Sequence, residues 1–440
     1  MLPTYVREAL LRLNEAGFEA WLVGGCVRDR LMGAEPHDYD ITTSATPEET
    51  EAVFAGERII ETGLRHGTVT VLLSGEPLEI TTFRTEAAYS DHRRPDAVRF
   101  TRSLREDLAR RDFTVNAVAM AADGCLCDPF GGQADLENRL LRAVGDPEAR
   151  FREDALRILR CARFSSVLGF AIEPATAAAM VRCRALLACV SAERIYAELT
   201  KLLCGQDVRR LLMEHTVVLG AVLPELLPMK GFDQRNFHHI YDVLEHTARV
   251  VENVPPAPRL RWAALFHDAG KPACFTLDEQ GVGHFYGHAE KSRELADAAL
   301  RRLKTDNATR EAADQLIRCH DWPMEPTAAV VRRALNKLGP EGLRDLIALK
   351  RADNLAQAPE FRDRQRTCDE IESLAAQILA EQQAFSLKDL AINGDDLRAL
   401  GMTPGPDMGR VLNELLEAVV SDRVPNEREA LLAAANALRP

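Results

Sequence analysis

The sequence predicts an α+β protein in which a small head of strands and helices precedes an all-helical remainder. Arg65 to Leu73 and Pro77 to Thr82 alternate apolar and polar residues around Ser74-Gly75, as expected for a strand pair. From about residue 148 onward, apolar residues recur with the period of a helix. Strands and helices that occupy separate parts of a chain are typical of this architecture.

Further elements follow from the same patterns. We expect a strand at Leu140 to Val144 and helices at Thr4 to Ala16, Ala149 to Leu168, Pro174 to Leu187, Ala192 to Leu203 and Val208 to Leu219. We divide the chain into a head (1–145), a helical neck (146–230), a third domain (231–370) and a helical tail (371–440).

Composition and charge exclude some classes of protein. The 440 residues carry a net charge of −12, so a general nucleic-acid coat is excluded and any nucleic-acid partner must meet local basic patches. No apolar run reaches the ~18 residues of a membrane-spanning helix, and no basic segment precedes an apolar one at the N-terminus. The ten cysteines include no C-x-x-C pair and suit reduced thiols. We therefore expect a cytoplasmic protein without a membrane partner.

A glycine pair between a strand and a helix marks the first candidate site. Phe18 to Val23 predicts a buried strand, and Val27 to Met32 predicts the start of a helix. Gly24 and Gly25 allow a tight turn between them. Backbone N–H groups at such a turn, together with Arg28, can bind phosphate, although a glycine pair alone is more often an ordinary turn.

Three acidic residues suggest a metal site beside this turn. Asp38 and Asp40 stand two residues apart, so in extended backbone both carboxylates project from one face. Glu79 alternates with apolar neighbours and faces away from the core, toward either solvent or the other two acids. Such a set can hold two Mg²⁺ ions for phosphoryl transfer, with a solvated loop as the alternative for the first two. Downstream, Arg111 can hold phosphate and Asp112 can accept a ribose hydroxyl.

A cationic helix suggests how a base is selected. Asp154 and Arg157 are separated by one helical turn, and Arg160 and Arg163 continue a cationic row. A carboxylate only accepts hydrogen bonds and a guanidinium only donates them. Cytosine and adenine each present an amine donor beside a ring-nitrogen acceptor, whereas guanine and uracil present the reverse order. The pair therefore predicts selection of C and A, with a surface salt bridge as the alternative.

Together these motifs resemble those of the bacterial class II CCA-adding enzymes, tRNA nucleotidyltransferases with a polymerase-β-like head. The matching motifs are Gly24-Gly25-x-x-Arg28-Asp29 with Asp38-x-Asp40, Arg110-Arg111-Asp112-Phe113-Thr114-x-Asn116-Ala117, Asp128-Pro129-Phe130-Gly131-Gly132, Glu153-Asp154-x-x-Arg157 and Ser191-x-Glu193-Arg194. The resemblance implies Mg²⁺-dependent addition of C, C and A to the 3′ end of tRNA from CTP and ATP, without a template and with release of pyrophosphate. Poly(A) polymerases share the head and are the alternative.

The family's flexible loop is also represented. The residues that carry this part of the resemblance are Arg84-x-Glu86 and Tyr89-x-x-His92-Arg93-x-Pro95. In this family an intact loop implies addition of the final A as well as of the two C nucleotides.

A second group of possible metal ligands lies in the third domain. Histidine and aspartate recur there on expected helices, at His246, His267, Asp268, His288, His320 and Asp353. The group resembles the HD phosphohydrolases, which implies four core ligands, His246, His267, Asp268 and Asp353, with His288 and His320 fitting a second metal. This resemblance implies a divalent transition metal and hydrolysis of phosphate esters. A purely structural domain packed against tRNA remains the alternative, and the resemblance assigns the tail to tRNA binding.

Overall fold

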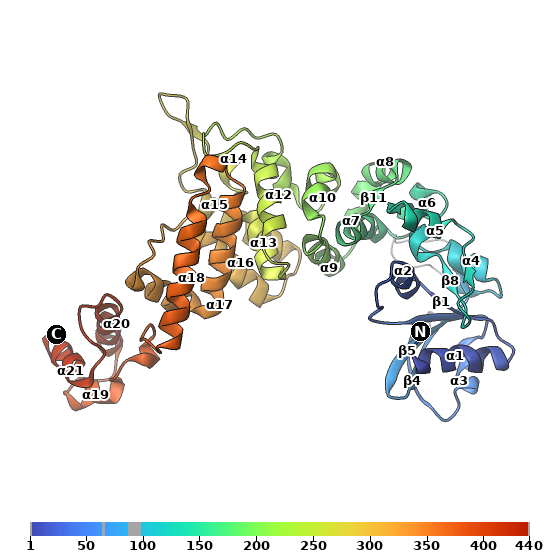
Figure 1. Ribbon diagram of the computed structural model, residues 1–440, viewed down its shortest axis with the longest axis horizontal. Helices are drawn as coiled ribbons and strands as arrows, with labels where there is room; N and C mark the ends of the chain where they lie inside the picture. Colours follow the sequence, from blue (N-terminus) through green and yellow to red (C-terminus); the bar gives the residue numbers. More distant parts are fainter. Residues whose placement is uncertain (1, 64–66, 87–97, 439–440) are drawn as a thin grey trace. The chain divides into compact units, whose positions relative to one another are not determined.

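The chain forms two compact units. The computed structural model describes residues 2–63, 67–86 and 98–438 (Figure 1). The first unit comprises Met1–Pro224 and the second Glu225–Pro440. Within the described ranges, no helix is both long and apolar enough to cross a membrane.

A mixed sheet forms the centre of the head. Its seven strands follow the order β3-β4-β5-β2-β1-β8-β9, and β2 and β5 run parallel while the other pairs run antiparallel. The strands are β1 (Ala20–Val23), β2 (Asp40–Thr43), β3 (Arg58–Gly63), β4 (Thr68–Leu73), β5 (Glu76–Thr82), β8 (Ala119–Met120) and β9 (Leu126–Cys127). The expected pair around Ser74-Gly75 is thus confirmed as β4 and β5.

One face of this sheet packs on two helices, α1 (Thr4–Glu15) and α3 (Pro47–Val53) (Figure 1). Ile41 of β2 and Ile80 of β5 are buried in the core on this side. Side chains alternate along a strand, so the residues next to these isoleucines project from the opposite face. That face carries a second small core, to which Val23 of β1 and Leu108 of α4 (Leu104–Ala109) contribute.

Smaller elements flank the sheet. These are α2 (Gly25–Leu31), the 3₁₀ turn η2 (Thr114–Asn116), α5 (Gly132–Glu137), and the two-stranded pairs β6 (Arg84–Glu86) with β7 (Val98–Phe100) and β10 (Leu140–Leu141) with β11 (Ala171–Ile172). The strand expected at Leu140 to Val144 is therefore shorter than predicted. Most of the loop motif, from Tyr89 to Pro95, lies outside the described residues.

The helices that follow the head are α6 (Pro147–Glu153), α7 (Leu156–Leu168), α8 (Pro174–Cys183), α9 (Ala192–Leu203), α10 (Val208–Glu214) and α11 (Thr216–Leu219). The helix expected at Ala192 to Leu203 is confirmed. The single helix expected at Ala149 to Leu168 is wrong, because Asp154 is extended and its carboxylate accepts from the N–H of Leu156. Aspartate often ends one helix and begins another in this way.

Two further single helices were also expected where the structure has interruptions. Val208 to Leu219 divides into α10 and α11 at His215. The segment expected at Pro174 to Leu187 ends its α-helical part at Cys183 and continues as the 3₁₀ segment η3 (Arg184–Cys189). A helical period alone did not distinguish one helix from two consecutive ones.

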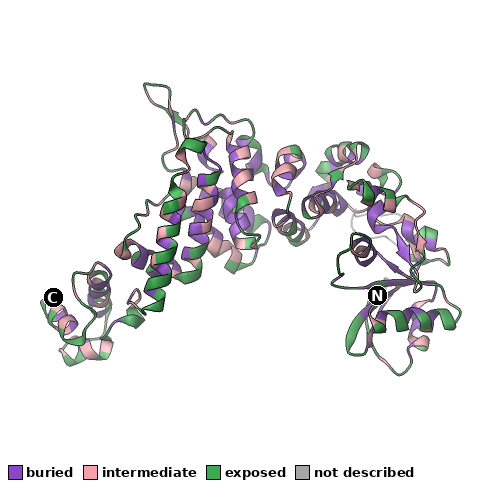
Figure 2. Ribbon diagram, in the orientation of Figure 1, coloured by how far each residue is buried: buried purple, intermediate pink, exposed green. Residues whose placement is uncertain are grey.

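The second unit is built mainly from long helices. These are α12 (Val243–Asn253), α13 (Pro258–Phe266), α14 (Lys271–Cys274), α15 (His288–Arg302), α16 (Asn307–Cys319), α17 (Ala328–Leu355), α18 (Arg364–Ala380), α19 (Gly394–Ala399), α20 (Pro406–Val420) and α21 (Arg428–Ala437). A short pair, β12 (Thr276–Leu277) and β13 (Gly283–His284), precedes α15. The helices bury their inward faces, while α18 exposes much of its outer side (Figure 2). The last three helices enclose a core of their own.

Candidate functional site

Two acidic residues of the head meet where the parallel strands pair. Asp40 begins β2 and is the register partner of Glu79 in β5, so both side chains leave the sheet on the same face. The neighbours Ile41 and Ile80 fill the core on the other face. The expectation that Glu79 faces away from that core is confirmed. Asp38 lies just before β2 and is exposed.

The Asp40 carboxyl has an unusual protonation equilibrium, although its side chain is accessible to solvent. Desolvation by the surrounding head and the negative charges of Glu79 and Asp38 raise its pKa to about 6, while Arg111 acts in the opposite direction. Repulsion of this kind among carboxylates favours binding of a cation between them. All the donor atoms here are carboxylate oxygens, which are the ligands that Mg²⁺ prefers.

The head acids do not form a closed metal cage by themselves. Among the described residues, two groups of possible metal ligands each have their ligand atoms within 4.8 Å of one another. Both groups belong to the second unit. In phosphoryl-transfer sites, the oxygens of the bound triphosphate and water complete the coordination of Mg²⁺.

The predicted glycine turn lies directly beside Asp40. Gly24 caps α2 with φ of 77° and ψ of −138°, a conformation that strains any residue with a Cβ. A Cβ at this position would lie 3.3 Å from Nη1 of Arg111 and 3.8 Å from Oδ2 of Asp40. The space over Gly24 is thus where a carboxylate and a guanidinium converge, as expected for a metal–triphosphate site.

Asp107 fixes the position of Arg111, and the sequence analysis missed it. Its fully buried carboxylate accepts from Arg110 at 2.8 Å and from Arg111 at 3.3 Å. The Thr42 hydroxyl donates to it at 3.1 Å. Burial raises the pKa of Asp107, but the two arginines outweigh this effect and the net shift is downward. Its spacing of three and four residues from these arginines on a helical pattern was the available sequence signal.

A buried network surrounds Asp112. Arg160 donates to Oδ2 of Asp112 at 2.9 and 2.7 Å, and Asn116 donates to Oδ1 at 3.1 Å. Arg28 in turn donates to Asn116 at 3.0 Å. Burial raises the pKa of Asp112, but the Arg160 charge and these hydrogen bonds lower it to about 2. Asp112 therefore stays ionised and ties the head to α7.

Asp154 and Arg157 stand together at the start of α7, but each has its own partners. Asp154 accepts from Arg194 at 2.9 Å, and from the Leu156 N–H at 3.0 Å. Arg157 is buried and donates to Glu153 at 2.6 Å and to the Arg110 carbonyl at 2.9 Å. These contacts hold both side chains in fixed orientations.

The other two arginines of the expected row share one acid and one ring. Arg163 lies 2.6 Å from Glu198, and Arg160 lies 3.9 Å from the same carboxylate. Both guanidinium groups lie over the Phe164 ring, at 3.8 and 5.3 Å from its centroid. The cationic row thus exists, and acidic and aromatic side chains orient it.

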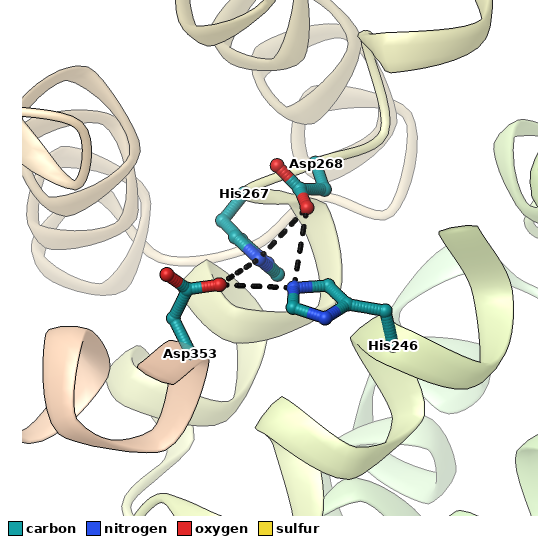
Figure 3. A group of neighbouring side chains, drawn as sticks. All are labelled: His246, His267, Asp268 and Asp353. Carbon is teal, nitrogen blue, oxygen red and sulfur yellow. Dashed lines mark hydrogen bonds and ion pairs between the residues drawn. The ribbon is translucent and has the colours of Figure 1, made fainter. Parts of the chain in front are cut away.

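The first set of histidine–aspartate residues in the second unit comes together from α12, the end of α13 and α17 (Figure 3). Nε2 of His246 lies 2.9 Å from Asp353 and 3.4 Å from Asp268. Nε2 of His267 lies 3.3 Å from Asp268 and 3.8 Å from Asp353. The four core ligands that the sequence suggested therefore form one group within 4.8 Å.

A second set shares Asp268 with the first. Asp268, His288 and His320 also place their ligand atoms within 4.8 Å of one another. Nε2 of His288 lies 3.3 Å from Asp268 and 3.2 Å from Nε2 of His320. The two positions that fit a second metal thus lie on the other oxygen of Asp268.

The histidine rings are oriented for metal binding. Nδ1 of three rings contacts a backbone carbonyl oxygen at hydrogen-bond distance: His267 with Ala264 at 2.8 Å, His288 with Phe285 at 2.9 Å, and His320 with Ile317 at 2.7 Å. Such contacts place the Nδ1 proton on the outer side and leave Nε2 as a lone-pair donor.

Two atoms inside the cluster support the same conclusion. Nε2 of His267 is buried without a hydrogen-bond partner, and it lies 3.3 Å from Oδ2 of Asp268, which forms an ion pair with Lys271. A buried polar atom without a hydrogen-bond partner is rare, and here it is a good metal donor that faces a carboxylate oxygen. The donor set of imidazole and carboxylate fits a divalent transition metal.

Lys271 also belongs to this cluster and was not recognised from the sequence. Its ammonium group lies 2.7 Å from Asp268 and donates to Gln234 at 2.9 Å. Burial raises the pKa of Asp268, but the charges of His267 and Lys271 outweigh it, so the net shift is downward. Its position three residues after Asp268 was the signal available in the sequence.

Three sequence profiles match parts of the chain. The profile described as "Poly A polymerase head domain" matches residues 20–142. "Probable RNA and SrmB- binding site of polymerase A" matches residues 169–230, and "tRNA nucleotidyltransferase domain 2 putative" matches residues 277–435. The last match crosses the predicted boundary at 370/371, so that boundary stays a prediction.

Curated relatives align with nearly the whole chain. The CCA-adding enzyme of Limosilactobacillus fermentum is 37% identical over 98% of this chain and 96% of its own. That of Streptococcus gordonii is 37% identical over 98% of this chain and 97% of its own.

Solved structures of CCA-adding enzymes share the fold of this chain. The Bacillus stearothermophilus CCA-adding enzyme in complex with CTP has a TM-score of 0.75 at 33% identity, covering 99% of this chain and 98% of that one. The Thermotoga maritima CCA-adding enzyme complexed with tRNA shares the fold, with a TM-score of 0.61 at 20% identity, covering 100% and 97% of the two chains.

Proposed function

This chain belongs to the family of CCA-adding enzymes, and from that premise we propose which of its residues carry out each part of the reaction. The protein is a tRNA nucleotidyltransferase that adds C, C and A to the 3′ end of tRNA from CTP and ATP. The tRNA 3′-hydroxyl attacks the α-phosphorus, a new P–O bond forms, and the bond to pyrophosphate breaks. The poly(A) polymerase alternative shares the head profile, whereas relatives aligned over the whole length are CCA-adding enzymes.

The observation that carries the assignment of catalytic residues is the parallel pairing of Asp40 with Glu79 beside the Gly24 turn. In our proposal Asp38, Asp40 and Glu79 hold the divalent metal that nucleotidyltransferases of this fold use, and we identify this metal as Mg²⁺. The bound ions would supply charge stabilisation for the attacking and leaving oxygens. Gly24, Gly25 and the side chains of Arg28 and Arg111 surround the triphosphate.

Asp112 and the arginines of α7 form the rest of the nucleotide site in this proposal. Asp112 accepts the ribose hydroxyl, and Arg160 and Arg163 contact the nucleotide. Each oxygen of Asp154 accepts one hydrogen bond in the structure, and a carboxylate oxygen has about two lone-pair sites, so acceptor capacity remains for an amine of C or A. In the same proposal, Arg157 donates to the adjacent ring nitrogen of the base.

The proposal is tested with tRNA that lacks its last nucleotides. Incubation with Mg²⁺ and each nucleoside triphosphate should give incorporation of C and then A, with little U or G. Asp40→Asn should abolish incorporation. Arg7→Ala, on an exposed position of α1, serves as a matched control and should retain it. Incorporation that survives Asp40→Asn would refute the assigned metal site.

We propose a second activity at the histidine–aspartate cluster, metal-dependent hydrolysis of phosphate esters. The cluster fits a divalent transition metal through His246, His267, Asp268 and Asp353, with His288 and His320 at a second position. The observation that favours it is Nε2 of His267, which is buried without a hydrogen-bond partner and lies 3.3 Å from the Asp268 carboxylate. A bound metal would supply an activated water, and the reaction would break the P–O ester bond with addition of that water.

Metal analysis and two substitutions separate this activity from the first. The purified chain should contain a divalent transition metal, and His267→Ala combined with Asp268→Ala should lose it together with phosphatase activity. The same double variant should retain CCA addition, because its two positions lie in the other unit. A metal-free wild-type protein that stays inactive with added Mn²⁺, Co²⁺ or Zn²⁺ would leave the domain with a structural role.

A further inference from the structure

Two cavities adjoin at the histidine–aspartate cluster. The first has a volume of about 370 Å³ and the second about 490 Å³. Both are lined by the same four residues, His320, Asp321, Asp353 and Arg364, so they meet at the edge of the cluster. Cavities of this size are typical of small-molecule sites.

The two cavities differ in chemistry. The first contains the cluster residues themselves and the buried ammonium group of Lys271. The second is lined by an aromatic and apolar wall, to which Trp322, Met324 and Ile371 contribute. A charged compartment next to an apolar one fits a ligand with a phosphate at one end and a flat apolar ring at the other.

The wall of the second cavity is held in place by two lysines. The Lys350 ammonium group donates to the carbonyls of His320 and Trp322, each at 2.6 Å. Lys337 lies 4.0 Å from the centroid of the Trp322 ring. These contacts couple the position of the Trp322 indole to that of the cluster residue His320. Contacts that hold a cavity wall before the ligand binds lower the entropy cost of binding there.

We propose that the second cavity binds the nucleoside part of a nucleoside phosphate whose phosphate lies at the cluster. The base stacks on the apolar wall formed by Trp322 and Met324, since stacking on an aromatic side chain suits any base. The exposed Arg364, which lines both cavities, contacts the phosphate. The proposal depends on the second activity proposed above only for the position of the phosphate.

Binding can be followed through Trp322 itself. Of the three tryptophans, Trp262 is fully buried, and Trp21 lies in the head. The full-length chain with Mg²⁺ is titrated with uridine 3′-monophosphate, a monophosphate whose base the head should reject. A saturable change in tryptophan fluorescence is expected, and it should disappear in Trp322→Phe and persist in Trp21→Phe. A signal that remains in Trp322→Phe would overturn the proposal.

Two substitutions separate the base from the phosphate. Met324→Glu should weaken binding of uridine 3′-monophosphate and of uridine by about tenfold. Leu379→Glu places the same charge on a partly exposed apolar position of α18 and should change neither affinity. Arg364→Ala should weaken binding of the monophosphate and leave the affinity for uridine unchanged. Ribose 5-phosphate, which has no base, should bind at least about tenfold more weakly than the monophosphate.

The outcome distinguishes this proposal from the hydrolase. Failure of the cluster to bind metal would refute the hydrolase but would leave the Trp322 response to uridine intact. No saturable response to uridine or its monophosphate up to about 10 mM would overturn the cavity assignment even if hydrolysis were observed. Equal affinity for ribose 5-phosphate and the monophosphate would also overturn it, because the base would then contribute nothing.

Discussion

Arg160 donates two hydrogen bonds to Asp112, at 2.9 and 2.7 Å, and thereby joins helix α7 to the head. Both side chains also belong to the proposed nucleotide site. The same ion pair therefore stabilises the domain that contacts the nucleotide and orients the carboxylate assigned to the ribose. Its contribution to stability and its contribution to activity can be measured separately.

Asp112→Asn should destabilise the protein at neutral pH. Because the folded state lowers the pKa of Asp112 to about 2, its ionised form stabilises the fold above the unfolded pKa, and this contribution is lost as the pH falls toward 2. We expect the free energy of unfolding to fall by about 2 kcal/mol at pH 7. Urea unfolding of the wild-type protein and the variant at pH 7 and pH 3 measures this. A deficit as large at pH 3 as at pH 7 would contradict the ion-pair explanation.

Asp40→Asn should have the opposite effect on stability when no metal is present. The pKa of Asp40 is raised to about 6, so ionisation of the folded protein costs stability, and that cost grows as the pH rises from about 4 through 6. Solvent screening limits the gain in the variant to less than about 1 kcal/mol. Thermal unfolding in EDTA should show a higher melting temperature for Asp40→Asn than for the wild type at pH 7.5. At pH 4 the two melting temperatures should not differ. A variant less stable than wild type at pH 7.5 would count against carboxylate repulsion.

Gly24→Ala should lose nucleotide binding as well as stability. The substitution strains a backbone with φ of 77° and places a Cβ 3.3 Å from Arg111. The strain costs about 1–3 kcal/mol. Gly33→Ala is the matched control, because Gly33 has the same φ of 77° with nothing within 4 Å of the added Cβ. Both variants should unfold at lower urea concentration, and only Gly24→Ala should show a raised KM for CTP. Equal KM values in the two variants would remove Gly24 from the triphosphate site.

Metal removal should destabilise the second unit. A metal that binds only the folded cluster adds about 2.7 kcal/mol of stability at a hundred times its dissociation constant. Chelation should therefore lower the melting temperature of the wild-type protein and leave His246→Ala unchanged. His284→Ala serves as the histidine control, since His284 contacts Asp278 in the β12–β13 region and lies outside both ligand sets. Loss of the chelator effect in this control would contradict a site confined to the cluster.

Sequence patterns predicted the face of each strand better than the ends of each helix. Glu79 was placed on the correct side of its strand because a period of two leaves only two choices. Asp154 was placed within one long helix, since the apolar period continues through it while its carboxylate caps the next helix. The break depends on a local hydrogen bond that competes with the helix, and periodicity does not report it.

The candidate sites also contain residues that the sequence predicted and residues that it did not. His267 and Asp268 were recognised because they follow an apolar run and further His and Asp residues stand on other expected helices. Asp107 and Lys271 were missed because their roles arise from burial next to residues that the fold supplies. The partners of Asp154 and Arg157, which are Arg194 and Glu153, likewise follow from tertiary structure. Chemistry carried by a motif can be predicted from sequence, whereas its supporting contacts require the fold.

The selection of C and A by Asp154 and Arg157 is tested most directly by the ratio of kcat/KM for CTP to that for UTP on tRNA lacking CCA. The wild-type enzyme should prefer CTP by roughly 10⁴, as expected for a hydrogen-bonding mismatch. Arg157→Ala should reduce this ratio by at least about tenfold, while Arg152→Ala, at an exposed position of α6, should leave it unchanged. An Arg157→Ala enzyme that is slower but keeps the full preference for CTP would contradict the account.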